Sequence, residues 1–329
     1  MTASSASLPV AGIDVSKRRF DVCLLQRDGT KAAASFDNHD QGFAQLDGWL
    51  KAHHADKILA GLEATGPYGV SLLWHLHAQG QSVCQLNPRH LKHYARSQGR
   101  RVKTDRTDAA LIASYLKNTE RLHLWQPPAQ ALIELQALVR RRQELMAALQ
   151  AERSRLDSCR NALVHASLQR QIAHLKEELA QIDQALDTHV LEHRELQKDM
   201  RLLQSIDGIG QKVAQTILAE VPAINAFSRA RDVAAFAGLT PTLAQSGTSV
   251  RRRGRMSKEG SALLRKMLYM AALQAVKRPH NAFHPMYEGF LLRGKAKMCA
   301  IGAIMHKLIR VAFGVLKHQK PFVLNFAKI

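Results

Sequence analysis

Apolar residues in the first 125 positions alternate between two spacings, which predicts strands and helices in turn. Branched apolar runs bounded by polar turns predict strands; these runs are 8–16, 20–26, 30–38, 57–66 and 82–88. Apolar residues three and four apart predict helices; these segments are 41–53, 69–80, 89–99 and 104–118. Three successive strands followed by alternating helix and strand predict an α/β fold with helices packed on a mixed sheet.

The pattern changes after segment 124–128, which contains two prolines. Residues 129–203 contain neither Pro nor Gly, and they include a seam of apolar residues spaced alternately three and four apart. The seam consists of Ile172, Leu175, Leu179, Ile182 and Leu186. We therefore expect a long helical coiled-coil arm over 129–203, with a turn near 161–167, where neither register fits. The arm serves either as a spacer or as a dimerisation element.

Glycine returns after position 204, and residues 204–329 predict a third, mainly helical domain. The stretch "SIDGIGQKVAQTILAEV" resembles a helix-hairpin-helix element. Gly208 and Gly210 would let backbone amides approach a phosphate at the start of the following helix. A plain Gly-rich connection between helices is the alternative.

The charge of the chain narrows the class of partner. The formal net charge is +20 and the isoelectric point is about 10.2, so nucleic acid is the expected polyanion and an acidic membrane surface the weaker alternative. We see no apolar run near the roughly 20 residues of a membrane span, and no secretory signal. The four cysteines are far apart and form no C-x-x-C pair, which argues against a zinc site or a disulfide framework. We expect a cytosolic protein.

Two acidic residues stand in apolar strands, where a charge is costly without a partner. Asp14 lies between Ile13 and Val15, and Glu63 ends the apolar part of segment 57–66. The ends of strands are where sites form in α/β sheets. A simpler interpretation is that each residue caps a turn at the end of its strand.

Two further acids, Asp105 and Asp108, are three positions apart and therefore share one face of the helix predicted over 104–118. Taken alone, Asp105 could cap the helix and Asp108 could complement its dipole. If the two strands and this helix are neighbours, all four carboxylates converge. Clustered carboxylates repel one another unless a divalent cation lies between them, and oxygen ligands favour Mg²⁺ or Mn²⁺. Two such ions form the usual clamp for phosphodiester chemistry.

The motifs "GIDVSK", "LEATG" and "KTDRTDA", with "NP" after the fifth strand, resemble the RuvC-like branch of the ribonuclease H fold. Within it they are similar to the DEDD insertion-sequence transposases, also called bridge-RNA-guided recombinases, whose relatives include the Piv-type DNA invertases. The resemblance implies that residues 8–125 form a RuvC-like catalytic domain and that Asp14, Glu63, Asp105 and Asp108 bind Mg²⁺.

The segments "FAGLTP", "QSGTSVRRRGRMSKEGSALLRKMLYMAA" and "RGKAKMCAIGAIMHKL" resemble the second domain of this family. The resemblance implies that Ser246 is a nucleophile that forms a covalent phosphoserine link to DNA. From the residues alone, Ser246 reads as a serine in an exposed loop, with Thr248, Ser249 and Ser257 as rivals. Arginine binds phosphate in a bidentate manner, and the basic residues that follow are Arg251, Arg252, Arg253, Arg255 and Lys258.

A second basic cluster surrounds the helix-borne acids and is expected to contact the phosphates beside the one that is cut. Its members are Arg100, Arg101, Lys103 and Arg106. A third run, 139–143, either lies on the polar face of the arm or grips a nucleic acid backbone. Aromatic residues make up 5% of the chain, with no interleaved stacking array, which argues against base reading by protein side chains.

The resemblance implies double-stranded donor and target DNA, a guide (bridge) RNA, and a homo-oligomer that is a dimer or a dimer of dimers. It also implies a bacterial cytoplasmic protein that is associated with the nucleoid when active. Two other functions remain open. One is a RuvC-like, metal-dependent, structure-specific endonuclease that uses water as the nucleophile. The other is a basic, coiled-coil, DNA-binding structural protein without catalytic activity.

Overall fold

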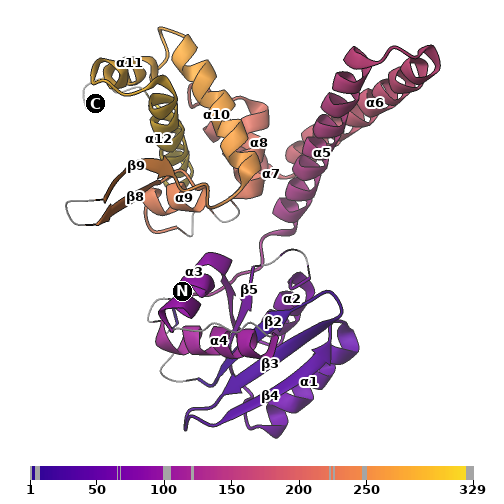
Figure 1. Cartoon of the computed structure of the whole chain (residues 1–329), viewed down its shortest axis with the longest axis vertical. Coiled ribbons are helices and arrows are strands. Elements are labelled where there is room, and N and C mark those ends of the chain that lie inside the picture. The colour runs from indigo at the N-terminus through magenta and orange to yellow at the C-terminus, as the bar shows by residue number, and fades with distance from the viewer. Residues whose placement is uncertain are drawn as a thin grey trace. The chain divides into compact units, whose positions relative to one another are not determined.

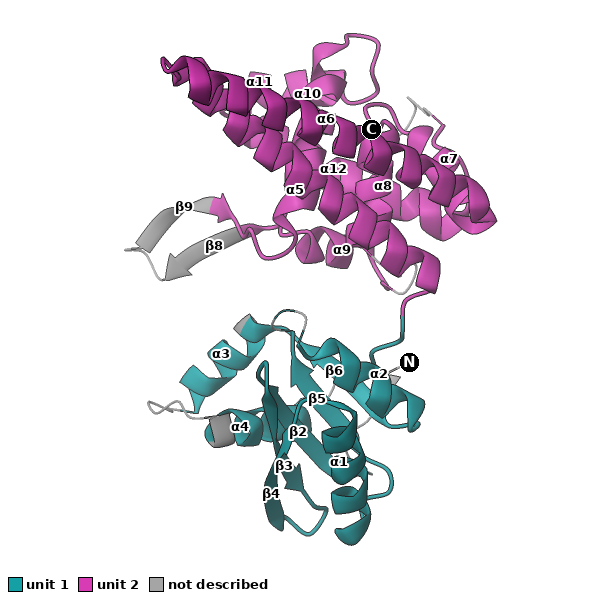
Figure 2. Ribbon diagram, turned by 90° about the vertical axis from the view of Figure 1, so that its right-hand side faces the viewer, with its two compact units in different colours: residues 1–127 teal, residues 128–329 magenta. Residues whose placement is uncertain are grey.

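The computed structural model divides the chain into two compact units, residues 1–127 and 128–329 (Figure 2). Side chains are not described at 2, 3, 89, 105, 106, 242–246 and 250–254. The backbone is described for residues 2–3, 8–64, 66, 68–98, 105–119, 122–221, 224, 227–246 and 250–323.

A five-stranded mixed sheet forms the centre of the first unit, and its order is β4-β3-β2-β5-β6. Strands β2, β3 and β4 form an antiparallel meander, whereas β5 and β6 run parallel to β2. This arrangement confirms the predicted mixed sheet. The strands are β2 (Val10–Val15), β3 (Arg19–Leu25), β4 (Lys31–Asp37), β5 (Leu59–Glu63) and β6 (Ser82–Leu86), with a separate short pair β1 (Thr2–Ala3) and β7 (Leu122–His123).

Helices cover both faces of the sheet. One buried cluster joins Ala11 and Ile13 of β2 to helices α1 and α2, whereas a second cluster joins Val10 to α3 and α4. Figure 2 shows these two helix pairs on opposite sides of the strands. The alternation follows from the period of two along a strand. The helices are α1 (Asp40–Ala52), α2 (Val70–Ala78), α3 (Pro88–Ser97) and α4 (Asp105–Asn118).

The second unit begins with two long helices, α5 (Gln130–Ser158) and α6 (Ala162–Glu192), which run side by side (Figure 1). Two residues of the predicted seam, Ile172 and Leu175, are buried against Leu145 and Leu149 of α5, while the coiled coil itself stays a prediction. The turn lies slightly earlier than expected, at 159–161, because the Asn161 side chain accepts hydrogen bonds from the first amides of α6 and caps that helix.

The lower part of this arm shares one core with the rest of the unit. Leu135 and Val139 of α5 and Leu186 of α6 pack in the same buried cluster as residues beyond 204. The predicted boundary between an arm and a C-terminal domain therefore stays a prediction. The remaining helices are α7 (Arg194–Gln204), α8 (Gln211–Glu220), α9 (Ala230–Phe236), α10 (Ala262–Lys277), α11 (His284–Leu292) and α12 (Lys297–His318).

A β-hairpin interrupts these helices, formed by β8 (Pro241–Ser246) and β9 (Val250–Met256). We expected an exposed loop around Ser246, and this expectation was wrong for the backbone of both strands. The sequence signal was weak because neither strand alternates apolar and polar residues; β9 reads "VRRRGRM".

Helix α12 is long and apolar enough, by length and composition alone, to cross a membrane, so the expectation that no apolar run comes near that length was wrong. Its 18-residue window has a mean hydropathy of 1.6. However, its apolar side chains, such as Leu308 and Ile309, are fully buried in the core of the second unit. The helix is therefore a core helix.

Candidate functional site

Asp14 and Glu63 lie at the same end of two adjacent parallel strands. The register pairs Gly12 with Gly61 and Ile13 with Leu62. Asp14 and Glu63 directly follow this last pair, so they lie next to each other at the ends of the two strands. Both are half-buried. Because side chains alternate along a strand, Asp14 shares a face with Gly12, and Glu63 shares a face with Gly61.

That face is the one covered by α4, and the two glycines allow the helix to approach closely. A Cβ atom at Gly12 would lie 2.1 Å from the carbonyl oxygen of Ala109 and 2.3 Å from the amide nitrogen of Ala113. A Cβ at Gly61 would lie 2.6 Å from Cδ1 of Leu116. The sequence repeats the pattern glycine, apolar residue, acid in both strands. The glycines therefore set the distance between α4 and the strands that carry the acids.

Helix α4 begins at the end of the sheet where Asp14 and Glu63 lie. Only residues 119–121 separate its last turn from β7, and the amide of Trp125 donates a hydrogen bond to Val83 O at the opposite end, where β6 begins. The helix must therefore run back along the strands from their carboxyl ends. Its first two turns carry Asp105 and Asp108, of which Asp108 is half-buried and the side chain of Asp105 lies outside the described residues.

The structure adds an acid that sequence reasoning missed. Asp21 of β3 lies directly opposite Asp14 in the antiparallel ladder and is half-buried. Its neighbours Phe20 and Val22 belong to the cluster with α1 and α2, so Asp21 points to the α4 face. The signal was available, since an acid in the apolar run "FDVCLL" is as unusual as Asp14 in its own strand. Two like charges facing each other across strands are destabilising without a cation.

The chemistry of this face suits a hard divalent cation better than zinc. Asp14, Asp21 and Glu63 lie on the face of the sheet that α4 covers, Asp108 lies near the start of that helix, and oxygen is the only ligand atom that these four side chains offer. Cys84 of β6 pairs with Gly61, which in turn pairs with Gly12, so the three residues are neighbours across the strands. Burial raises the pKa of the Cys84 thiol to about 12, so Cys84 is a packing residue. Among the described side chains, no group of three His, Cys, Asp or Glu residues lies close enough together to hold a metal ion. Asp14, Glu63 and Asp108 each have polar or electrostatic partners.

The candidate nucleophile is at the far end of β8. Ser246 pairs with Val250 as the last pair of the ladder, so the ladder holds its backbone. Its side chain lies outside the described residues, as do those of Arg251, Arg252 and Arg253. Arg255 is exposed and has at least one interaction partner. The roles predicted for these residues remain predictions.

The Gly-rich turn between α7 and α8 is packed into the second unit. Gly208 has a φ of +91°, and a Cβ there would lie 2.9 Å from Cβ of Ala275 on α10. Packing and backbone conformation therefore account for Gly208 without a ligand. Gly210 caps α8, is exposed, and has open space where a Cβ would stand. The backbone of Gly210 is exposed, as a phosphate contact requires, and the phosphate contacts predicted for Gly208 and Gly210 remain predictions.

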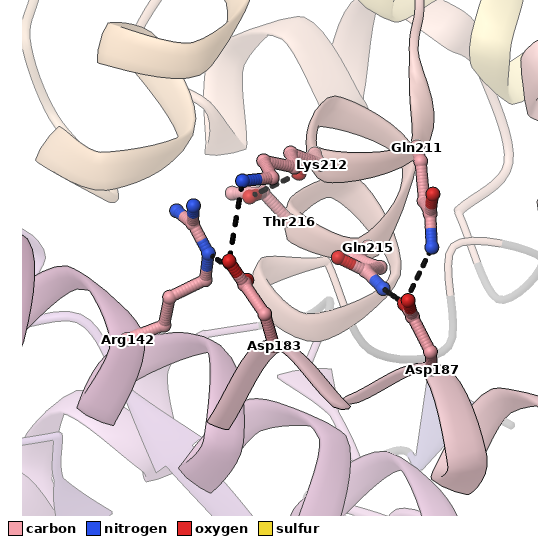
Figure 3. Close-up of polar contacts among 7 residues, drawn as sticks. All are labelled: Arg142, Asp183, Asp187, Gln211, Lys212, Gln215 and Thr216. Atoms are coloured by element: carbon pink, nitrogen blue, oxygen red, sulfur yellow. Dashed lines mark hydrogen bonds and ion pairs between the residues drawn. The ribbon is translucent and has the colours of Figure 1, made fainter. Parts of the chain in front are cut away.

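A polar network attaches the arm to α8 (Figure 3). Asp183 of α6 accepts a hydrogen bond from Nε of Arg142 on α5 at 2.6 Å, and Lys212 Nζ of α8 lies 3.4 Å from its other oxygen. One turn further along α6, Asp187 accepts hydrogen bonds from the side chains of Gln211 and Gln215. The network holds the start of α8, and hence the Gly-rich turn, in a set position relative to both arm helices.

We expect Asp183→Asn to lower the melting temperature at pH 7 by roughly 2–4 °C, because a partly exposed charge pair contributes about 1 kcal/mol. Burial raises the pKa of Asp183, but Arg142 and Lys212 outweigh it and place the pKa below its usual value. The stabilisation is thus complete above about pH 4 and is lost as the pH falls through the lowered pKa. In melting curves recorded from pH 7 to pH 3, the difference in melting temperature between Asp183→Asn and wild type should shrink as the pH falls. Glu177→Gln, which changes an exposed residue of α6, should melt at the wild-type temperature throughout. A difference between Asp183→Asn and wild type that is independent of pH would contradict this assignment.

Several predicted contacts cannot be placed. Arg100, Arg101 and Lys103 lie outside the described residues, and only the backbone of Arg106 is described, in the first turn of α4. The basic run 139–143 is described and lies on α5. There Arg140 forms an ion pair with the buried Glu220 at 3.0 Å and Arg142 with Asp183 at 2.6 Å, so these two cations are occupied within the second unit.

Two family models match the chain. Residues 11–164 match a model described as "Transposase", for the DEDD type, and residues 200–288 match one described as "Transposase IS116/IS110/IS902 family". A pilin gene-inverting protein of Moraxella bovis is 32% identical over 313 residues, which covers 94% of this chain and 96% of that protein. The transposase for insertion sequence element IS1111A of Coxiella burnetii is 28% identical, with coverage of 97% and 92%.

Among solved structures, Thermus thermophilus RuvC in complex with a Holliday junction substrate matches 35% of this chain and 98% of its own, with a TM-score of 0.27 and 11% identity. The sequence relatives define the class as enzymes that recombine DNA, namely transposases and DNA invertases. Within this class, the chain belongs to the IS110 family of DEDD transposases.

Proposed function

We propose that this transposase cuts and rejoins DNA strands with a divalent metal ion, Mg²⁺ or Mn²⁺, and a covalent phosphoserine intermediate. The first unit then has the RuvC-like variant of the ribonuclease H fold, which the antiparallel meander followed by two parallel strands supports. Asp14, Glu63, Asp105 and Asp108 would hold the metal. The observation that carries the proposal is the placement of Asp14 and Glu63 at one end of adjacent strands, on the face over which the acid-bearing helix begins.

The chemistry divides between the two units. When bound, the metal ion supplies the positive charge that stabilises the transition state of phosphodiester cleavage. Ser246 Oγ loses its proton and attacks the phosphorus, and the displaced deoxyribose oxygen leaves as a hydroxyl. A hydroxyl from another DNA strand then attacks the phosphoserine, which restores Ser246 and forms the new phosphodiester. One bond is exchanged for another in each step, so no external energy source is needed.

The partners follow from the same proposal. Double-stranded donor and target DNA are the substrates, and the net charge of +20 favours binding of their phosphates. A guide RNA would read the sequence, in keeping with the low aromatic content of the chain. Strand exchange requires more than one active site, so we propose a dimer or a dimer of dimers in which the arm contributes contacts. The protein would act in the bacterial cytoplasm, at the nucleoid. The guide RNA is tested by sequencing the RNA that co-purifies with the protein.

Ser246→Ala is expected to eliminate the protein–DNA adduct and strand exchange. The wild-type protein, with its co-purified RNA, is incubated with Mg²⁺ and a labelled duplex spanning the end of the element. A covalent adduct that resists detergent should then appear on a denaturing gel. Ser257→Ala provides the matched control, because the Ser257 Oγ atom is buried. That variant should form the adduct as wild type does.

The carboxylate site belongs wholly to the first unit, which favours one second candidate, a RuvC-like endonuclease with water as the nucleophile. If the wild-type protein cuts the duplex without any adduct, and Ser246→Ala cuts equally well, the endonuclease is correct and the phosphoserine mechanism is rejected.

A further inference from the structure

Lys258 adopts a backbone conformation that lysine normally avoids. Its φ is +57°, in the left-handed region where a Cβ atom costs stability and glycine is favoured. His54 and Gln319 also have positive φ values, but both follow helix ends, where this conformation is common. Lys258 instead lies between β9 and α10, at the base of the hairpin that carries Ser246. Its conformation therefore has no helix-capping explanation.

The surrounding turn holds this conformation firmly. The amide of Lys258 donates a hydrogen bond to Gly238 O at 3.1 Å, and Nη1 of Arg265 donates one to Gly260 O at 2.8 Å. A Cβ at Gly260 would lie 2.0 Å from Phe236 O, so the backbones touch directly. The segment 257–260 is thus locked against the end of α9, as is typical of strained residues retained at functional sites.

The Lys258 side chain is exposed, and within the described part of the chain it makes no ion pair or hydrogen bond. The Lys258 side chain therefore makes no polar contact that would stabilise the fold and offset the strain of its backbone. The same turn also buries Ser257 Oγ without a partner among the described residues, a second cost in stability. Arg265 is different, because its guanidinium donates hydrogen bonds to the backbone carbonyls of Ala237 and Gly260. Burial lowers the pKa of Arg265.

We infer that lysine is kept at position 258 for its side chain, which binds a phosphate of the DNA backbone at the base of the β8–β9 hairpin. The inference rests on the proposed DNA substrate and deepens it. Among the cations of this region it separates Lys258, which contacts DNA at the expense of stability, from Arg265, which braces the turn. The hairpin base would then anchor the DNA while the tip with Ser246 reaches the scissile bond.

The test measures stability and DNA binding on the same purified full-length variants. Lys258→Gly should raise the melting temperature by roughly 2 °C, because glycine relieves the strain. Its Kd for a duplex DNA at 0.1 M NaCl should rise about 3–10-fold, and the slope of log K against log salt should lose about 0.9, the value of one phosphate contact. Lys258→Arg should bind DNA as wild type does. Arg265→Gln should show the reverse pattern, with a lower melting temperature and an unchanged salt slope.

Lys31→Asn and Lys258→Asn form a matched pair, since each removes one charge from an exposed lysine, and asparagine tolerates the left-handed conformation. Only Lys258→Asn should change the slope. An unchanged slope for Lys258→Gly overturns the inference, as does a lower melting temperature, and a change seen with duplex RNA but not DNA overturns the assigned partner. Binding is measured without divalent metal, so the result is independent of whether Ser246 or the carboxylates perform the proposed chemistry.

Discussion

Gly12→Ala is expected to reduce DNA strand cleavage by at least about 100-fold, although position 12 is not one of the proposed ligands. The added Cβ would lie 2.1 Å from Ala109 O and 2.3 Å from Ala113 N, both backbone atoms of α4. Neither atom can turn away, so the helix must move by about 1 Å to reach ordinary contact distance. Asp108 immediately precedes Ala109 and moves with it. Displacements of this size in a catalytic constellation cost on the order of 100-fold in rate.

Gly61 provides the comparison that separates helix placement from general damage to the core. The three atoms nearest to a Cβ at Gly61 all belong to the Leu116 side chain, with Cδ1 at 2.6 Å. Gly61→Ala should therefore destabilise by about 1–3 kcal/mol through overpacking. The double variant Gly61→Ala with Leu116→Val removes both Cδ atoms, which are among the three atoms nearest to the added Cβ, and should recover most of the stability and cleavage. Leu116→Val cannot rescue Gly12→Ala, because the contacts of Gly12 are with backbone.

The measurement is cleavage of a labelled duplex by variants whose circular dichroism shows a folded chain, together with the Mg²⁺ concentration that gives half-maximal rate. A Gly12→Ala protein that is folded and cleaves within about threefold of wild type would show that the distance of α4 from the sheet does not position the site. If Gly12→Ala does not fold, the Gly61 and Leu116 variants still decide the matter, because the proposal requires the double variant to recover cleavage along with stability.

The five-stranded sheet of the first unit could be predicted from sequence because each of its strands is either buried or bounded by a clear turn, whereas the short strands β1 and β7 carry no such pattern. The runs containing Ile13 and Leu62 read as strands, and the acids that follow them were recognised as anomalous for that reason. What the sequence could not supply was the pairing of the strands. Asp21 also stands out as an acid in an apolar run, but only the ladder shows that it lies opposite Asp14. The glycines before both acids acquire meaning only once α4 is seen resting on them.

In the second unit, the sequence was a poorer guide both to the strands and to the role of the glycines. The strand around Arg252 is polar and basic throughout, so the period-two signal on which strand prediction depends is missing. Gly208 suggested a phosphate contact, yet its positive φ and its contact with Ala275 are explained by packing on α10, a partner more than 60 residues away in sequence. Local motifs identify the residue type that a turn needs. They do not show whether the need comes from a ligand or from a neighbouring helix.

Asp14→Asn and Asp108→Asn are each expected to lower strand cleavage on the order of 1,000-fold or more while leaving DNA binding unchanged. Asparagine keeps the shape of the side chain but removes the charge that a divalent ion requires. The basic residues that precede α4 in the sequence should behave in the opposite way, so that neutralising Arg101 or Lys103 weakens DNA binding, more strongly at low salt. Unchanged recombination in cells by Asp14→Asn and Asp108→Asn would indicate a structural DNA-binding protein instead.

The same variants give a second signature that is independent of catalysis, because Asp14 faces Asp21 across the ladder and lies level with Glu63. In metal-free buffer, Asp14→Asn should melt at a higher temperature than wild type, since it removes like-charge repulsion. Adding Mn²⁺ should raise the melting temperature of wild type, because the ion binds only the folded state, and should have little effect on the variant. Asp56→Asn, an exposed acid near the opposite end of the sheet, controls for net charge. If Mn²⁺ shifts Asp14→Asn as much as wild type, the ion does not bind at these strand ends.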